Sequence, residues 1–236
     1  MQEIKEIGLT IHDLIDGNAD YIEDYLNLYS ELFPEYVRYL PLMRHRAQKP
    51  LDVAANERWH QWLLLVQNEP VGMIGFLYNK KRNVGVLMDF AIKPKARTIE
   101  YPPKQSFAKL NLLLAMQKLC EDSQLNGYSC PLFMIAEVEH SRLLEKYMEY
   151  GYLKFPVEYF EPPFPPELVG VSVETQNLDK MEYKQMYLGA FQVPGFPFNP
   201  NTPSLIETAL LTMLVDHYGL PLDHQLTQKA LSEIPN

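Results

Sequence analysis

The order of apolar segments in the middle of the chain limits the fold more than any other feature of the sequence. Three apolar runs follow one another at residues 62–66, 71–78 and 84–92. The first two are separated only by a short group of turn residues at positions 68–70. Apolar runs bounded by turn residues predict β-strands, and a connection this short predicts a hairpin. A basic segment broken by proline follows the third run.

Two helices and two further strands are predicted after this basic segment. Ser106 to Leu119 carries apolar residues at helical spacing, and Ser106 suits the N-cap position. A strand is predicted from Leu132 to Val138. The next helix is expected to take Ser141 as its cap and to stop at Gly151. Tyr152 to Phe160 then has the apolar character of a last strand.

The two ends of the chain differ in character. The N-terminal end predicts a short strand over 7–14 and a helix over 19–33 that stops before Pro34. A proline-rich break at 161–166 separates off the C-terminal end. The elements expected beyond it are a strand over 169–175, a helix over 179–191, and a helix opened by Thr202-Pro203 and running through Leu214.

Charge limits the classes of partner. The 236-residue chain has a net charge of −9, which argues against general nucleic-acid binding. Residues 80–109 nevertheless hold eight basic residues against Asp89 and Glu100, a local excess of six. The basic residues are Lys80, Lys81, Arg82, Lys93, Lys95, Arg97, Lys104 and Lys109. They form either a solvated rim or a docking site for a small polyanion such as a nucleotide phosphate.

Cysteine and hydropathy patterns indicate the compartment. Cys120 and Cys130 lack metal-ligand spacing, which favours reduced thiols and no metal site. No apolar run approaches the length of a membrane span, and residues 1–7 have no signal-peptide core. We therefore expect a cytoplasmic protein that does not enter membranes.

Two motifs resemble a known superfamily. The segment 90–97, with sequence FAIKPKAR, is similar to the strand end of the GNAT superfamily of acyl-CoA-dependent N-acyltransferases, and the segment 147–152, YMEYGY, resembles its Tyr-x-x-x-Gly-aromatic helix end. The helix, strand and helix between the motifs have about the right spacing. The resemblance implies a GNAT-like α/β (α+β) fold with a mixed, mostly antiparallel sheet flanked by helices. It also implies acetyl-CoA or another acyl-CoA as co-substrate.

The phosphate-binding loop departs from that family. Its members grip the pyrophosphate with backbone N–H groups of a Gly-rich loop at a helix N-terminus. Arg97 matches the start of the loop, but Glu100 and Pro102 fill both glycine positions. Proline also lacks the N–H donor. The residues expected to bind the cofactor either match the family or replace the backbone donors of its Gly-rich loop. They are Ile92, Lys95, Arg97, Lys104, Gln105 and Ser106. Alternatively, the site no longer binds the cofactor.

Three residues are candidates for catalysis. Tyr147, four residues before Gly151, occupies the position of the family's general acid, which protonates the departing thiolate. Asp89, inside an apolar strand, is a candidate base, because burial raises a carboxyl pKa. Glu137, at the end of the next strand, is its rival. The alternatives are that Tyr147 packs in the core and that either carboxylate forms a structural ion pair.

The resemblance implies a GNAT-like acyltransferase domain over residues 1–160, and the proline-rich break predicts a mainly helical, proline-linked extension over 161–236. The extension is expected to pack on the domain or on a second subunit, which allows a homodimer. The leading hypothesis is direct acyl transfer from acyl-CoA to a small-molecule or peptide amine. The alternative is a GNAT-like module that has lost catalysis and serves in binding, regulation or dimerisation.

Overall fold

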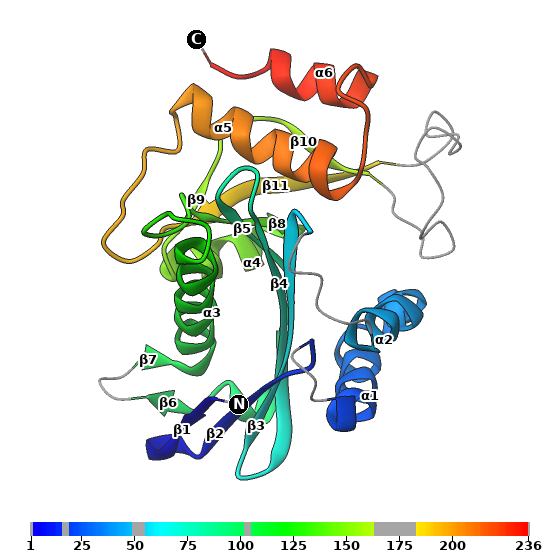
Figure 1. Cartoon of the computed structure of the whole chain (residues 1–236), viewed down its shortest axis with the longest axis vertical. Helices are drawn as coiled ribbons and strands as arrows, with labels where there is room; N and C mark the ends of the chain where they lie inside the picture. The colour runs from blue at the N-terminus through cyan, green and yellow to red at the C-terminus, as the bar shows by residue number, and fades with distance from the viewer. Residues whose placement is uncertain (1, 16–18, 49–54, 102–104, 163–182, 236) are drawn as a thin grey trace. The chain divides into compact units, whose positions relative to one another are not determined.

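The computed structural model describes residues 2–15, 19–48, 55–101, 105–162 and 183–235 (Figure 1). The chain forms two compact units. Unit 1 comprises residues 1–80 and 85–130, and unit 2 comprises residues 81–84 and 131–236. These bounds differ from the domain boundary expected after residue 160, because the extension shares a sheet with the segment that precedes it.

The strands of unit 1 follow the chain order. They are β1 (Gln2–Ile4), β2 (Leu9–Asp13), β3 (Glu57–Val66), β4 (Glu69–Asn79) and β5 (Val84–Ile92), each beside the next. The pairs from β1 to β4 are antiparallel. Gln67 and Asn68 turn the β3–β4 hairpin with φ of 52° and 67°. Paired positive φ angles match the right-handed twist of the strands, so the predicted hairpin is confirmed.

Helices cover both faces of this sheet. α1 (Ile22–Leu32) and α2 (Leu40–Gln48) lie on one side of β3 and β4, and α3 (Phe107–Gln124) lies on the other (Figure 1). Short 3-10 helices precede α1 at Ala19–Tyr21 and α2 at Pro34–Tyr39. The core beneath α1 and α2 consists of buried side chains from both layers, among them Leu14, Tyr25, Tyr29, Leu63, Leu65 and Met73. The predicted helix over 19–33 is confirmed.

A buried polar network ties the sheet of unit 1 to α3. Asp13 Oδ2 lies 2.5 Å from His60 Nδ1, and Asp122 Oδ2 lies 2.8 Å from His60 Nε2. Arg58 donates to the other oxygen of Asp122 at 3.0 Å. His60 and Asp122 are 3% and 0% exposed. Desolvation opposes a charge on His60, but the hydrogen bonds to Asp122 and Asp13 outweigh it and raise its pKa to about 9.

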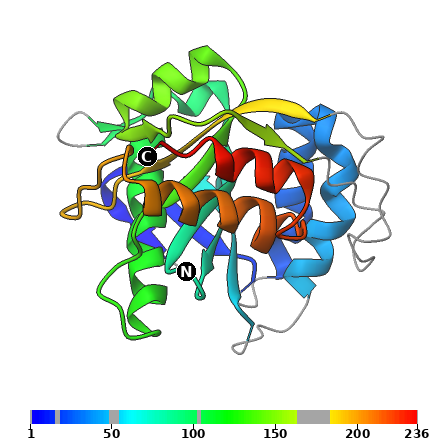
Figure 2. The same ribbon diagram turned by 90° about the horizontal axis from the view of Figure 1, so that it is seen from above.

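Unit 2 has β11 (Lys184–Phe191) at the centre of its strands. β11 runs antiparallel to β8 (Met134–Val138), β9 (Tyr152–Lys154) and β10 (Tyr159–Glu161). Its helices are α4 (Ser141–Glu149), α5 (Pro203–Leu210), which continues as a π-helix over Leu211–His217, and α6 (Gln225–Ser232). α5 and α6 lie side by side (Figure 2). The expected mixed α/β class with a mostly antiparallel sheet is confirmed.

The helix predicted over 179–191 is wrong where the structure describes it, because residues 184–191 form β11. Gly189 shows the reason. A Cβ there would lie 2.3 Å from the Leu153 carbonyl oxygen, so this position serves close approach between strands and not a helix. The strand expected over 169–175 lies outside the described residues. The strand expected over 152–160 divides into β9 and β10.

The predicted helix ends are largely confirmed. Ser106 caps α3 by accepting a hydrogen bond from the Lys109 amide at 3.2 Å. Gly151 follows α4 with φ of 97°, which suits the residue after a helix end. Thr202 precedes α5, which begins at Pro203. For α4 the prediction was one residue off, because His140 occupies the N-cap position and Ser141 is the first helical residue.

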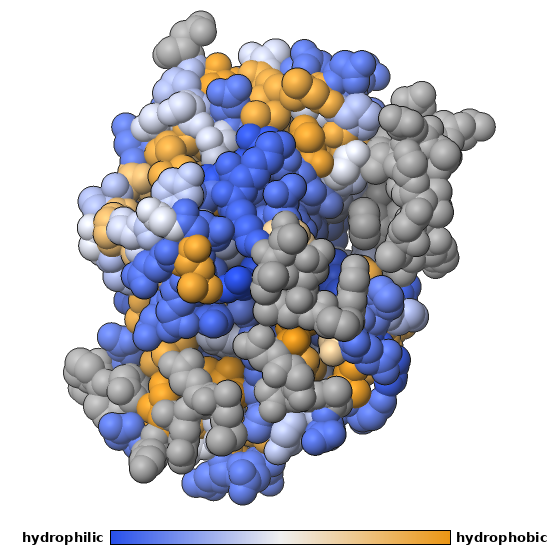
Figure 3. All heavy atoms as spheres, viewed as in Figure 1, coloured by the Kyte–Doolittle hydropathy of each residue, from blue (hydrophilic) through white to orange (hydrophobic). Residues whose placement is uncertain are grey.

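Two features of the described residues concern possible contacts with membranes or with a second subunit. Over the described parts of the chain, no helix has the length and apolar character to cross a bilayer. Hydrophobic residues gather near α5 and α6 with hydrophilic residues around them (Figure 3). Leu222, just before α6, is 56% exposed. A homodimer stays a prediction.

The His60 network predicts a pH-dependent stability. A histidine whose pKa rises on folding stabilises the native state below its unfolded pKa and loses this contribution as pH rises through the folded value. We expect the free energy of unfolding to fall by about 3 kcal/mol between pH 6.5 and 9 relative to His60→Gln. Urea unfolding of both proteins across this range measures the difference. A difference that does not change with pH would contradict the network as described.

Candidate functional site

The predicted cofactor residues of unit 1 gather at the end of β5. Ile92 is its last residue and is 5% exposed. A 3-10 turn over Pro94–Ala96 follows, and Arg97 Nε donates back to the Ile92 carbonyl at 2.9 Å. Lys95 and Arg97 are exposed. The turn therefore places two cations next to the backbone at the strand end.

The N-terminus of α3 is organised differently from a Gly-rich phosphate loop. Glu100–Tyr101 (β6) and Gln105–Ser106 (β7) form a small hairpin directly before the helix. The Phe107 amide donates to the Ile99 carbonyl at 3.2 Å, and the Lys109 amide donates to Ser106 Oγ. Two N–H groups at the helix start are thus engaged within the chain. Pro102 and Lys104 lie outside the described residues.

Acidic residues neutralise part of the basic segment. Lys95 pairs with Glu69 at 2.7 Å and Lys93 pairs with Glu31 at 2.8 Å. In unit 2, Lys81 and Arg82 both pair with Asp216. Among the seven of these basic residues that the structure describes, at least four therefore have a carboxylate partner. A solvated rim and a polyanion site both stay open as interpretations, and Arg97 lies at the start of the predicted loop.

Asp89 lies on the face of β5 that α1 and α2 cover. Tyr29 of α1 donates to Asp89 Oδ1 at 3.3 Å. The other oxygen, Oδ2, receives no hydrogen bond from a described residue, and it points toward Gly75 of β4, where a Cβ would lie 3.3 Å away. The absence of a side chain at Gly75 thus lets the Asp89 carboxylate pack closely against β4. Neither Tyr29 nor Gly75 was predicted to take part.

Burial sets the protonation of Asp89. Desolvation raises its pKa to about 6, while Arg46 and the Tyr29 hydrogen bond act in the opposite direction. The group is therefore mostly ionised at neutral pH but holds a proton more readily than an exposed aspartate. This property suits a base that must accept and release protons near neutrality.

Glu137, the rival base, lies in unit 2 with both oxygens occupied. Tyr159 of β10 donates to Oε1, and Tyr218, which follows the π-helix, donates to Oε2 at 2.8 Å. Tyr218 also lies 3.3 Å from Glu161. Desolvation and then the charge of Glu161 raise the pKa of Glu137, against the two hydrogen bonds. The extension thus supplies a direct contact that the sequence did not predict.

Tyr147 lies within an aromatic cluster of unit 2. Its ring centroid is 6.1 Å from that of Tyr152 and 5.2 Å from that of Phe191. The side chain is 7% exposed, and burial raises its pKa above that of an exposed phenol. Tyr147 therefore keeps its proton at neutral pH, and it also helps to pack α4 on the strands.

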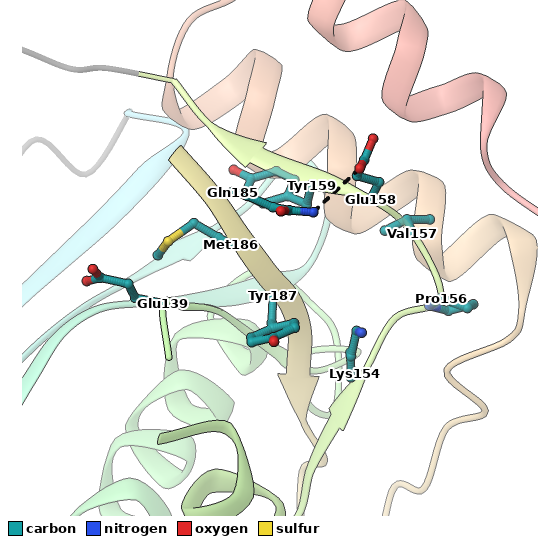
Figure 4. Close-up of a pocket in the computed structure, with 9 residues that line it drawn as sticks. All are labelled: Glu139, Lys154, Pro156, Val157, Glu158, Tyr159, Gln185, Met186 and Tyr187. Carbon is teal, nitrogen blue, oxygen red and sulfur yellow. Dashed lines mark hydrogen bonds between the residues drawn. The ribbon is translucent and has the colours of Figure 1, made fainter. Parts of the chain in front are cut away.

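Unit 2 also contains a cavity of ≈ 460 Å³ beside β11. In Figure 4, Glu139 and Lys154 lie on either side of the β11 ribbon. Lys154 lies 4.8 Å from the Tyr187 ring centroid, Glu139 pairs with Lys184, and Glu158 pairs with Lys229. The charged groups of this cavity are thus largely compensated within the chain.

Comparisons with solved structures identify the fold. A protein from Bacteroides thetaiotaomicron assigned to the GNAT family of acetyltransferases matches with a TM-score of 0.55 and 16% identity, over 90% of this chain and 99% of that one. The chain has the GNAT fold. The fold predicted from the two motifs is therefore confirmed.

Two further matches with the GNAT fold are weaker. A spermidine N-acetyltransferase chimera from Vibrio cholerae and hSSAT has a TM-score of 0.48 and 14% identity, over 80% of this chain and 98% of that one. A Bacillus subtilis acetyltransferase in complex with CoA has a TM-score of 0.44 and 13% identity, over 78% and 98%. No protein-family model and no curated protein sequence matches the chain.

The Tyr218 contact predicts a cost for losing one hydroxyl. Tyr218→Phe leaves Glu137 with one hydrogen bond fewer, which should lower the free energy of unfolding by about 1–3 kcal/mol where the carboxylate is ionised. Desolvation and the charge of Glu161 raise the pKa of Glu137 to about 8, so the loss should be larger at pH 9 than at pH 6.5, where the protonated carboxyl needs the donor less. Urea unfolding at pH 6.5 and 9 measures both effects. Tyr128→Phe, at a residue 51% exposed, is the control and should change nothing. Equal losses for both variants would count against the contact.

Proposed function

We propose that this protein is an N-acyltransferase that moves an acetyl or other acyl group from acyl-CoA to an amine, with Asp89 as the general base. The observation that supports Asp89 over Glu137 is the number of carboxylate oxygens that already accept a hydrogen bond within the protein. Asp89 has one oxygen that accepts from Tyr29 and one that accepts no hydrogen bond from a described residue, whereas both oxygens of Glu137 accept hydrogen bonds from tyrosine hydroxyls.

In the proposed reaction the nitrogen loses two protons and the sulfur gains one. An ammonium group has no lone pair, so Asp89 first takes a proton from the bound amine. The amine nitrogen then attacks the thioester carbon, and the carbon–sulfur bond breaks. The departing thiolate takes a proton from Tyr147, the nitrogen releases its second proton to solvent, and Tyr147 regains a proton from solvent. Burial raises the pKa of Tyr147, which weakens it as an acid, so its contribution is expected to be smaller than that of Asp89.

Acyl-CoA is proposed as the co-substrate, and the protein's charged side chains as its phosphate ligands. Lys95 and Arg97 stand next to Ile92 at the strand end, where the GNAT resemblance expects the cofactor. Lys104, Gln105 and Ser106 precede α3 in the sequence. Guanidinium and ammonium groups bind phosphate oxygens by charge-assisted hydrogen bonds, which compensates for engaged backbone amides. A cytoplasmic location stays a prediction.

A second candidate function has one specific observation in its favour. The Phe107 and Lys109 amides at the start of α3 are already bonded to Ile99 and Ser106. A chain that no longer needs to grip pyrophosphate is free to make such contacts. On this alternative the GNAT fold serves as a binding or regulatory module without catalysis.

Calorimetric titration with acetyl-CoA separates the two functions. We expect micromolar binding that weakens about 10- to 100-fold in the double variant Lys95→Ala/Arg97→Ala, because charged hydrogen bonds to phosphate are lost. The control replaces two lysines on other helices, Lys118→Ala/Lys146→Ala, and should bind as the original protein does. Absence of binding to acetyl-CoA and to longer acyl-CoAs would favour the binding module.

The base is tested by a pH profile. Release of the CoA thiol is measured with a panel of amines, first with the original protein and then with Asp89→Asn. We expect kcat/KM to rise with pH through a midpoint of about 6, the pKa of Asp89. Asp89→Asn should lower the rate about 10²- to 10⁴-fold. If Glu137→Gln abolishes the low-pH limb and Asp89→Asn does not, the assignment is reversed.

A further inference from the structure

Three polar groups on the α1/α2 face of unit 1 have unused hydrogen-bonding capacity. The Tyr25 hydroxyl of α1 is buried without a partner, in a side chain that is 1% exposed. The Arg46 guanidinium of α2 lies 3.5 Å from the Trp59 ring centroid and makes no hydrogen bond or ion pair with any residue that the structure describes. Oδ2 of Asp89 is the third group.

These groups act on one another electrostatically. Burial raises the pKa of Tyr25, Asp89 raises it further, and Arg46 lowers it. Desolvation lowers the pKa of Arg46 to about 10, against the charge of Asp89. Arg46 also opposes the rise in the pKa of Asp89. The three groups therefore lie within electrostatic reach, although Arg46 and Asp89 do not form an ion pair.

Native proteins rarely leave such groups unsatisfied. The large majority of buried side-chain polar atoms have a hydrogen-bond partner, and an unsatisfied one calls for an explanation such as a catalytic role, a water or a bound molecule. Guanidinium and phenol groups donate, so Arg46 and Tyr25 require an acceptor and favour an anionic one. A carboxylate accepts, so Asp89 requires a donor and favours a cation.

We propose that the cluster formed by Tyr25, Arg46 and Asp89 binds a zwitterion, a small molecule with both a carboxylate and an ammonium group, such as a free amino acid. The carboxylate is held by Arg46 and Tyr25. The ammonium group is held by Oδ2 of Asp89, which accepts no hydrogen bond from a described residue. The binding of a zwitterion does not depend on the proposed function. Only the role of its nitrogen as acyl acceptor rests on that function.

Simpler ligands satisfy the cluster less well. A plain amine gives Asp89 its donor but leaves the Arg46 and Tyr25 donors without an acceptor. A plain carboxylate satisfies those donors but adds a negative charge near Asp89. A zwitterion satisfies all three groups and brings no net charge into a partly buried site, where a net charge is costly.

The test compares amino acids with their decarboxylated amines. The twenty L-amino acids are screened by thermal shift, and tyrosine/tyramine, histidine/histamine and lysine/cadaverine are titrated calorimetrically without acyl-CoA. We expect at least one amino acid to bind. The corresponding amine, which lacks the carboxylate, should bind at least about tenfold more weakly. If no amino acid binds, or an amine binds as tightly as its parent, the proposal is overturned.

Variants assign the carboxylate contact. Arg46→Gln should remove the preference for the amino acid over its amine. Tyr25→Phe should weaken amino-acid binding roughly tenfold while keeping or raising the melting temperature, because the orphaned hydroxyl is removed. Arg44→Gln, on the same helix at a residue paired with Glu23, is the control and should bind normally. If Arg46→Gln is folded, as judged by its melting temperature, and still prefers the amino acid over its amine, the assignment of Arg46 is overturned.

The result is separable from the proposed function. Binding of an amino acid without acyl transfer would retain the zwitterion site and reject the acyltransferase. Acylation of plain amines without preference for amino acids would retain the acyltransferase and reject the zwitterion site.

Discussion

Both ring nitrogens of His60 are held by carboxylates, and unit 1 depends on this pair of contacts. Asp13 brings in β2 and Asp122 brings in α3, so one side chain of β3 fixes the neighbouring strand and the covering helix together. Buried charges are costly to desolvate, and leaving one partner alone costs more than keeping the set. The network therefore specifies which face of the hairpin meets α3, and the opposite face is left for α1 and α2. Asp89 lies on that opposite face.

The sequence predicted those elements whose patterns are local. The β3–β4 hairpin, the Ser106 cap and the Gly151 stop each rest on a few neighbouring residues, and each is confirmed. β11 was missed because it is a strand through pairing with β8, β9 and β10, and such partners are distant in the chain. The β6–β7 hairpin was missed for a related reason, since two residues per strand carry no periodic pattern. The Tyr218–Glu137 contact spans 81 positions and has no sequence signal.

The candidate site likewise combines a residue that the local sequence pattern predicts with residues that only distant contacts bring together. Asp89 was a candidate because a carboxylate inside an apolar strand stands out in the sequence. The groups that determine its behaviour, Tyr29, Arg46 and Gly75, come from three other elements and look like ordinary core or surface residues. A glycine in a strand signals close approach, but the sequence does not say what approaches it. The structure identifies the approaching group at Gly75 as the Asp89 carboxylate.

The start of α3 and the end of β5 together limit how a diphosphate could be held. A helix N-terminus binds phosphate through N–H groups that have no partner. Here the Phe107 amide is bonded to Ile99, so a phosphate would have to compete with an existing contact. For a cationic side chain the competition is weak when its carboxylate partner is exposed, because a solvent-exposed ion pair such as Lys95–Glu69 contributes little to stability. Replacing Glu69 by a phosphate as the partner of Lys95 should therefore cost less free energy than breaking the hydrogen bond between the Phe107 amide and the Ile99 carbonyl. If this chain binds acyl-CoA, side chains rather than backbone should carry most of the phosphate affinity, and the affinity should fall as salt concentration rises.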